Sequence, residues 1–232
     1  MTNSFLLEIT VESMEAAFAA ERGGADRVEL CADLPSGGLT PAFELMHNAR
    51  AALRLPIFVM VRPRTGDFSY NDDEIVLMKS QIIQARKLGM NGIVLGILRQ
   101  DKTVDIARLE SLVESAKPLP VTFHRAFDDT PDPYRALEAV ISAGAARILT
   151  AGGTLRAPDS LEILSRLVKS AGQRVVVMPG GGIHAENIAL VKNATNAREF
   201  HSGLGSVLPY GSTDFARFEE EVRRLAEQKC LA

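Results

Sequence analysis

Short apolar, β-branched segments alternate with longer amphipathic segments along the whole chain, and this alternation repeats eight times. The short segments predict strands at 5–10, 26–31, 57–62, 91–97, 120–125, 146–150, 174–179 and 197–201. Between them, apolar residues recur at spacings of three and four, which predicts helices, as in 13–24, 161–172 and 214–228. Ser13 and Thr40 are the predicted N-caps of two of these helices.

This order of elements predicts an α/β fold in which crossover helices join parallel strands. Eight such units in 232 residues match a (β/α)₈ TIM barrel, whose usual length is roughly 250 residues. An open doubly wound sheet is the alternative, but no strand has the polar character of an exposed edge. The first strand also runs into Thr10 without the glycine fingerprint of a dinucleotide site. We therefore predict a single (β/α)₈ TIM barrel domain over residues 1–232.

Side chains alternate between the two faces of a strand, so a charged side chain next to apolar neighbours indicates which face points into the lumen. Five strands place such residues on the face opposite the helices, mostly near their C-terminal ends, where active sites of this fold lie. The alternative is a compensated ion network, because buried charges are rare unless they are paired. The predicted lumen residues are Glu8, Glu29, Arg62, His124 and His201.

The loops at the same end of the barrel add further candidate site residues. The segment after the fifth strand contributes Arg125 and Asp128. Glycine-rich turns follow strands seven and eight, and the first of them is predicted to open a helix near His184, an arrangement that favours phosphate binding. The alternative is that the glycines only permit a tight turn. The candidate anion-binding residues are Gly180, Gly181, Gly182, Ser202 and Gly203.

Composition excludes several classes of partner. The net charge of -3 provides no basic surface for nucleic acid. No apolar run approaches the roughly 18 residues of a membrane span, and the N-terminal segment lacks the features of a signal peptide. The two cysteines cannot form the disulfide framework of a secreted domain. A cytoplasmic location, without nucleic-acid or membrane partners, is the expectation.

Several motifs resemble the CutC family when they are taken in order along the chain. They are GGADRVELC, GGLTP, VRPRTGDF, PVTFHRAFD, RILTAGG and VVMPGGGI, and the resemblance spans about residues 5–201. It implies a cytoplasmic (β/α)₈ barrel that is typically a homo-oligomer. It also implies a link to copper homeostasis, with Cu(I) bound by some members and no reaction firmly attached to the family.

The resemblance further implies a Cu(I) site formed by two cysteines in animal members, one at the end of the first strand and one in the VELC motif. In this chain the VELC cysteine is Cys31, whereas Thr10 occupies the first-strand position. Cu(I) prefers soft thiolate or thioether donors, and a hydroxyl group is a poor substitute. Cys31 is therefore the candidate metal ligand, and copper is the candidate cofactor.

Two functional classes stay open, and whether the chain is an enzyme is left undecided. The first is a copper homeostasis protein that binds Cu(I) through Cys31. The second is a barrel enzyme of the isomerase, lyase or hydrolase type acting on a small anionic or phosphorylated metabolite. In that case Glu8 or Glu29 would be the base, His124 the acid, and Arg62 and Arg125 the anion clamp. A scaffold protein explains the charged lumen least well.

Overall fold

The computed structural model describes the backbone of residues 4–231 and the side chains of residues 4–229. The strands are β1 (Leu6–Val11), β2 (Arg27–Leu30), β3 (Ile57–Met60), β4 (Gly92–Leu95), β5 (Val121–Phe123), β6 (Arg147–Thr150), β7 (Val176–Pro179) and β8 (Glu199–Ser202). The helices are α1 (Met14–Gly23), α2 (Phe43–Ala52), α3 (Asp72–Lys87), α4 (Ile106–Ala116), α5 (Pro133–Ser142), α6 (Leu161–Ala171), α7 (Ile188–Thr195) and α8 (Phe215–Leu231). Three 3₁₀ turns, η1 (Leu34–Ser36), η2 (Arg125–Asp129) and η3 (Ala157–Ser160), lie between them.

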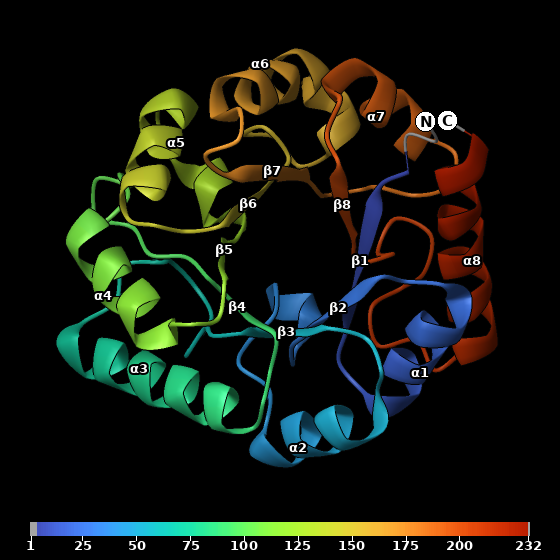
Figure 1. Ribbon diagram of the computed structural model, residues 1–232, viewed down its shortest axis with the longest axis horizontal. Coiled ribbons are helices and arrows are strands. Elements are labelled where there is room, and N and C mark those ends of the chain that lie inside the picture. The colour runs from blue at the N-terminus through green and yellow to red at the C-terminus, as the bar shows by residue number, and fades with distance from the viewer. Residues whose placement is uncertain (1–3, 232) are drawn as a thin grey trace.

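The strands form one parallel sheet in the order β7-β6-β5-β4-β3-β2-β1-β8, which curls into a nearly closed barrel surrounded by the helices (Figure 1). The two end strands, β7 and β8, contact each other. Gly180, at the end of β7, permits this contact, because an added Cβ would lie 3.1 Å from His201 Cβ and 2.4 Å from Leu149 Cδ1. The predicted (β/α)₈ TIM barrel is confirmed.

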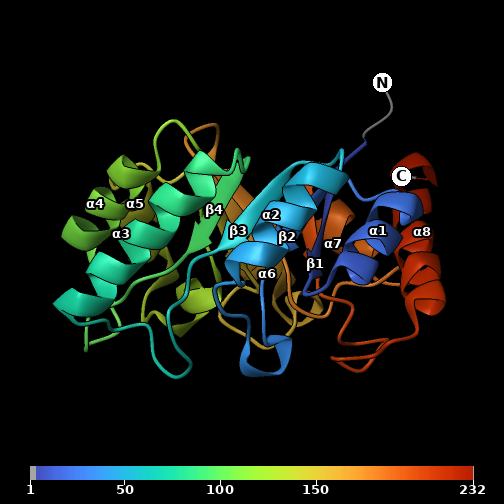
Figure 2. The same ribbon diagram turned by 90° about the horizontal axis from the view of Figure 1, so that it is seen from below.

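Side-chain alternation divides each strand between the helices and the lumen. Leu7 and Ile9 on β1 and Phe200 on β8 are fully buried in the main hydrophobic core, between the strands and the helices. The loops after β2, β3 and β8 project from one end of the barrel, opposite the end at which β1 begins (Figure 2). Among residues 4–231, every helix is too short or too polar to cross a membrane.

One of the two predicted N-caps is found. Ser13 accepts a hydrogen bond from the N–H of Ala16 and caps α1. Thr40 is not a cap, because α2 begins only at Phe43. Instead, the Thr40 hydroxyl accepts the N–H of Arg62 at 2.9 Å and so joins the loop after β2 to the end of β3.

A compensated ion network fills the N-terminal half of the lumen. Arg27 contacts Glu8 and lies 2.7 Å from a carboxylate oxygen of Glu199, which also accepts a hydrogen bond from Arg147 at 2.9 Å. Both guanidinium groups stack on the Phe58 ring, at 4.6 and 5.0 Å from its centroid. Glu8 therefore belongs in part to an ion network, which was the alternative to a functional role. The candidate site lies on the C-terminal side of this network.

Candidate functional site

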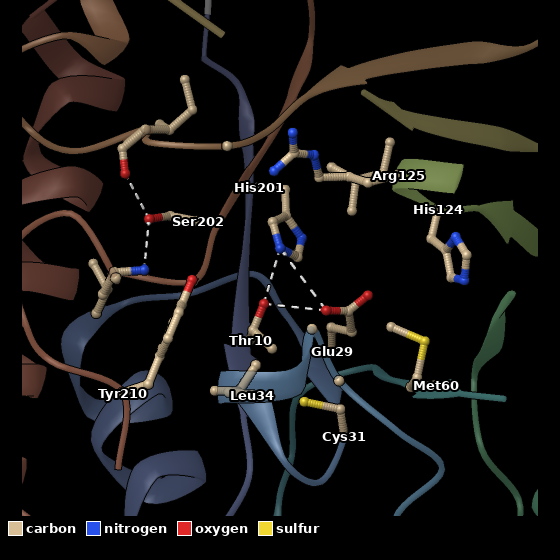
Figure 3. A pocket seen from close by; sticks show the side chains of 18 of the residues that line it. Thr10, Glu29, Cys31, Leu34, Met60, His124, Arg125, His201, Ser202 and Tyr210 are labelled. Atoms are coloured by element: carbon tan, nitrogen blue, oxygen red, sulfur yellow. Dashed lines mark hydrogen bonds and ion pairs between the residues drawn. The ribbon is translucent and has the colours of Figure 1, made fainter. Parts of the chain in front are cut away.

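A cavity of about 190 Å³ opens at the C-terminal end of the strands (Figure 3). Most of the predicted site residues line it, namely Glu29, Cys31, His124, Arg125, Gly181, Gly182, His201, Ser202 and Gly203. The others, Glu8, Arg62, Asp128 and Gly180, lie behind its wall. The structure thus brings together residues from β2 and β8 and from the segments that follow β2, β5, β7 and β8.

A chain of buried hydrogen bonds forms the floor of the cavity. His201 Nδ1 lies 2.7 Å from Glu8 Oε1, and His201 Nε2 lies 2.9 Å from Thr10 Oγ1. Thr10 in turn donates to Glu29 Oε2 at 3.1 Å (Figure 3). Strand register produces this chain, because Glu8 is paired with His201 across β1 and β8, and Thr10 with Glu29 across β1 and β2.

The three ionisable groups of the chain have shifted pKa values. Burial alone would raise the pKa of Glu8, but the hydrogen bond with His201 and the charge of Arg27 lower it to about 2. Burial raises the pKa of Glu29 and outweighs the opposing charge of His201. Burial would lower the pKa of His201, but the carboxylates of Glu29 and Glu8 raise it. Glu8 is therefore a fixed anion, whereas Glu29 and His201 compete for a proton.

Thr10 couples the protonation of its two neighbours, because its hydroxyl group carries a single proton. When His201 is charged, it donates to Thr10, and Thr10 donates to the Glu29 carboxylate. When Glu29 is protonated, the same contacts run in reverse, and Thr10 donates to a neutral His201. Both arrangements keep the two hydrogen bonds of Thr10, so a proton can move between Glu29 and His201 without an intervening water.

Two residues that line the cavity each have a buried polar atom without a hydrogen-bond partner among the described residues. These atoms are Glu29 Oε1 and His124 Nε2. His124 Nδ1 accepts the N–H of Ala126 at 3.1 Å, which places the proton of the neutral ring on Nε2. Burial and the charge of Arg62 lower the pKa of His124 to about 3. His124 is therefore neutral with an unused N–H donor, and Glu29 Oε1 is an unused acceptor.

Arg62 has a different position from the one predicted. Its Nη1 donates to Ser36 O at 3.0 Å and to Gly38 O at 3.3 Å, and its Nη2 donates to Gly66 O at 2.9 Å. The guanidinium also stacks on the Phe68 ring, 4.9 Å from its centroid. Because both terminal nitrogens of its guanidinium donate to loop carbonyl groups, Arg62 holds the loops after β2 and β3 in place and does not itself line the cavity.

Asp128 likewise holds a loop, whereas Arg125 reaches the cavity. Asp128 Oδ1 accepts the Thr150 hydroxyl at 2.5 Å and the N–H of Ala151 at 3.1 Å, which fixes the segment after β6. Arg125 Nε donates to Asp128 Oδ2 at 2.8 Å. Its Nη1 lies 3.2 Å from where a Cβ on Gly181 would be. Arg125 is thus the arginine that lies beside the glycine turn.

The glycine turns expose backbone donors to the cavity. Gly181 and Gly182 adopt φ angles of +96° and +68°, which side chains disfavour. Within residues 4–231, the N–H groups of Gly181, Gly182 and Gly203 make no hydrogen bond to protein. The prediction that a helix opens near His184 is wrong. Helix α7 begins at Ile188, and the side chain of Asn187 accepts the His184 N–H at 3.0 Å. Turn amides, and not a helix end, therefore provide the donors.

Cys31 is buried against the cavity beside a second sulfur. Its Sγ donates to Val11 O at 3.7 Å, and it packs in a small cluster with Met60. A Cβ on Gly38 would lie 3.7 Å from Cys31 Sγ and 3.5 Å from Met60 Cε. Burial and the charge of Glu29 raise the pKa of the Cys31 thiol. The pair offers soft donors of the type that Cu(I) prefers, but the thiol must lose its proton to bind.

Two of these residues have roles that the sequence analysis missed. Met60 lies two positions before Arg62 on the same face of β3, so strand alternation was a signal for it. Thr10 was not among the predicted site residues, because its place between Glu29 and His201 depends on the register of three strands. Glu8, Glu29 and His201 also form a buried group whose ligand atoms lie within 4.8 Å of one another. Their hard donors suit metals other than Cu(I).

Comparisons with known proteins agree on one family. The family model described as "CutC family" matches residues 5–206. The human copper homeostasis protein cutC homolog is 44% identical over 209 residues, which cover 90% of this chain and 77% of the relative. A family protein CutC from Salmonella newport is 44% identical over 204 residues, which cover 88% of this chain and 82% of the relative.

Solved structures give the same result at the level of the fold. The structure of a CutC protein from Streptococcus agalactiae aligns with a TM-score of 0.82 and 32% identity, over 85% of this chain and 98% of that one. N-(5'-phosphoribosyl)anthranilate isomerase from Pyrococcus furiosus aligns with a TM-score of 0.60 and 16% identity, over 96% and 99% of the two chains. The second similarity extends to the barrel fold alone.

Proposed function

The chain belongs to the CutC family, and we propose that its cavity performs acid–base chemistry on a small anionic metabolite, with Glu29 exchanging a proton with the substrate. The observation that supports this is the buried chain from Glu8 through His201 and Thr10 to Glu29, which ends at an unpartnered oxygen of a cavity residue. Such a group, with a raised pKa, suits the proton transfers of an isomerase, lyase or hydrolase.

Each residue of the chain contributes one step. Glu8 holds the His201 ring through Nδ1 and stays ionised, so that Nε2 faces Thr10. His201 supplies a proton to Oε2 of Glu29 through Thr10, or takes one back. The charge of Glu29 therefore adjusts through buried groups, and its other oxygen is the one proposed to contact the substrate.

The structure favours specific residues for the roles that the sequence left open. Glu29 is the better base, because both oxygens of Glu8 are bound by Arg27 and His201. His124, with its pKa near 3, is neutral at pH 7, which supports a role as a hydrogen-bond donor to a substrate oxygen instead of the predicted acid. Arg125 and the glycine amides are the proposed anion site, without Arg62.

A screen of small anions tests this proposal, since a ligand that binds the folded state raises the melting temperature. We expect phosphorylated or carboxylated metabolites to stabilise the wild-type protein. Glu29→Gln should retain binding but lose conversion of the ligand, whereas the exposed control Glu44→Gln should retain both. Two results would contradict the proposal: no stabilisation by any anion, or equal turnover by Glu29→Gln.

A second candidate function is Cu(I) binding through Cys31, with copper as the cargo. The specific observation in its favour is that Cys31 and Met60 face the same gap beside Gly38. Since binding must displace the thiol proton, the affinity should rise with pH. A competition titration with a Cu(I) chelator tests it. Cys31→Ser should abolish uptake, Met60→Leu should weaken it, and equal uptake by Cys31→Ser would rule out this site.

Cytoplasmic location and homo-oligomeric assembly are proposals that rest on the family resemblance. The net charge of -3 is consistent with the absence of a nucleic-acid partner. Cell fractionation tests the location, and light scattering of the purified protein tests the assembly. Recovery in the membrane fraction, or a mass of one chain at micromolar concentration, would contradict them.

A further inference from the structure

A second cavity, of about 170 Å³, adjoins the first beneath the segment that joins β8 to α8. The two cavities share the wall formed by Thr10, Leu34, Gly203, Leu204 and Tyr210. Apolar side chains dominate the remainder of the second cavity, and the largest are Leu208, Phe215 and Phe218. A cavity of this volume can hold an aromatic ring, because an apolar cavity of about 150 Å³ in another protein binds benzene.

Tyr210 lies at the boundary between the two cavities. Figure 3 shows its side chain at the end of the first cavity opposite His124. Its ring lies flat against Gly205, where a Cβ would be 2.4 Å from Tyr210 Cζ. Tyr210 is 51% exposed, so it is not fixed within the core. A half-exposed side chain that contacts Gly203 and Gly205 therefore lies between the two cavities.

Polar and apolar walls meet at Gly203. Its N–H makes no hydrogen bond to protein within residues 4–231 and belongs to the proposed anion site. The same residue also lines the apolar cavity. A molecule whose anionic group is bound at Gly203 would thus have its next atoms beside the residues that line both cavities.

We propose that the second cavity is the subsite for an apolar arm of the ligand, which makes the substrate class a small anion with an aromatic or branched alkyl substituent. The inference that the ligand has an anionic end rests on the proposed function. The inference that it has an apolar arm rests on the second cavity itself. The arm would gain free energy by leaving water for an apolar enclosure, with Tyr210 covering the junction.

Inorganic phosphate and phenyl phosphate are the matched probes, since they differ only by the ring. We expect phenyl phosphate to bind about 10- to 100-fold more tightly, as expected for burial of a phenyl-sized side chain. Ala16→Leu, which fills the second cavity, should reduce this ratio toward one without changing phosphate binding. The matched control is Ala52→Leu at the exposed end of α2. In the wild-type protein, the methyl signals of Leu208 should shift with phenyl phosphate and not with phosphate.

The outcomes separate this inference from the proposed function. If both probes bind equally and Leu208 does not respond, the apolar subsite is overturned while the anion site stands. If neither anion binds, the anionic site fails, and a titration with toluene decides the subsite alone. A toluene-dependent shift of Leu208 that Ala16→Leu abolishes then supports the subsite, and an unchanged Leu208 overturns it.

Discussion

Thr10 is the residue whose chemistry separates the two candidate functions. Its hydroxyl group accepts and donates one hydrogen bond each, and so connects Glu29 with His201. A thiol at this position would be a weaker hydrogen-bonding group and a soft metal donor. The position that the family resemblance links to copper is therefore, in this chain, part of a buried hydrogen-bond chain, which we propose as a proton pathway.

Replacing Thr10 by valine keeps the shape of the side chain and removes the bridge. We expect Thr10→Val to lower the free energy of unfolding by about 1–3 kcal/mol, because a buried oxygen of Glu29 loses its donor. The pKa of His201 should also change, since its link to Glu29 is broken. Denaturant unfolding and ¹⁵N signals of the imidazole measure both effects. Thr10→Ser should restore them, and an unchanged His201 titration in Thr10→Val would argue against the pathway.

Replacing Thr10 by cysteine tests the copper hypothesis in the opposite direction. We expect Thr10→Cys to bind Cu(I) at least about tenfold more tightly than the wild-type protein, because a second soft donor is added. Competition with a Cu(I) chelator measures the affinity. Adding Cys31→Ser to this variant should remove the gain. If Thr10→Cys binds no better than wild type, a donor at position 10 does not share a copper ion with Cys31.

At the scale of elements, strand alternation predicted the faces of the barrel but not what happens beyond the strand ends. Glu29 and His201 were assigned correctly to the lumen because the neighbours of each on its own strand determine its face. Arg62 lies just after the end of β3. The direction of its side chain depends on contacts with the loops after β2 and β3, which strand alternation does not predict. The start of α7 was missed for the same reason, because the Asn187 side chain stabilises a turn ahead of the helix.

The turns after β7 and β8 should bind anions through their free amides. We expect the backbone signals of Gly181, Gly182 and Gly203 to shift at tens of millimolar phosphate and to shift less as salt is added. Gly172, which also has positive φ and lies at the end of α6, is the control signal that should not move. If all four signals stay still, the glycines only permit a turn.

The whole barrel divides its lumen between structure and chemistry. The N-terminal half holds the network of Arg27, Arg147, Glu199 and Glu8, in which two positive charges face two negative ones. The C-terminal half keeps a cavity with two unpartnered polar atoms. Closure of the barrel was predictable from the eight repeated units, whereas this division was not, because it depends on register between strands distant in sequence.

Glu8 connects the two halves, and it should make the stability of the whole molecule depend on pH in the acid range. Its pKa is about 2 in the folded protein, against an ordinary value of 4.5. A lowered pKa stabilises the folded state above pH 4.5, and this stabilisation disappears as the pH falls toward 2. The shift corresponds to about 3 kcal/mol at neutral pH.

We therefore expect Glu8→Gln to be less stable than the wild-type protein by about this amount at pH 7, with the difference shrinking between pH 4.5 and pH 2. Denaturant unfolding at a series of pH values measures the difference. Glu110→Gln removes an exposed carboxylate from α4, outside the lumen, and should show no comparable change. A difference between wild type and Glu8→Gln that stays constant down to pH 2.5 would mean that Arg27 and His201 do not hold Glu8 in its charged form.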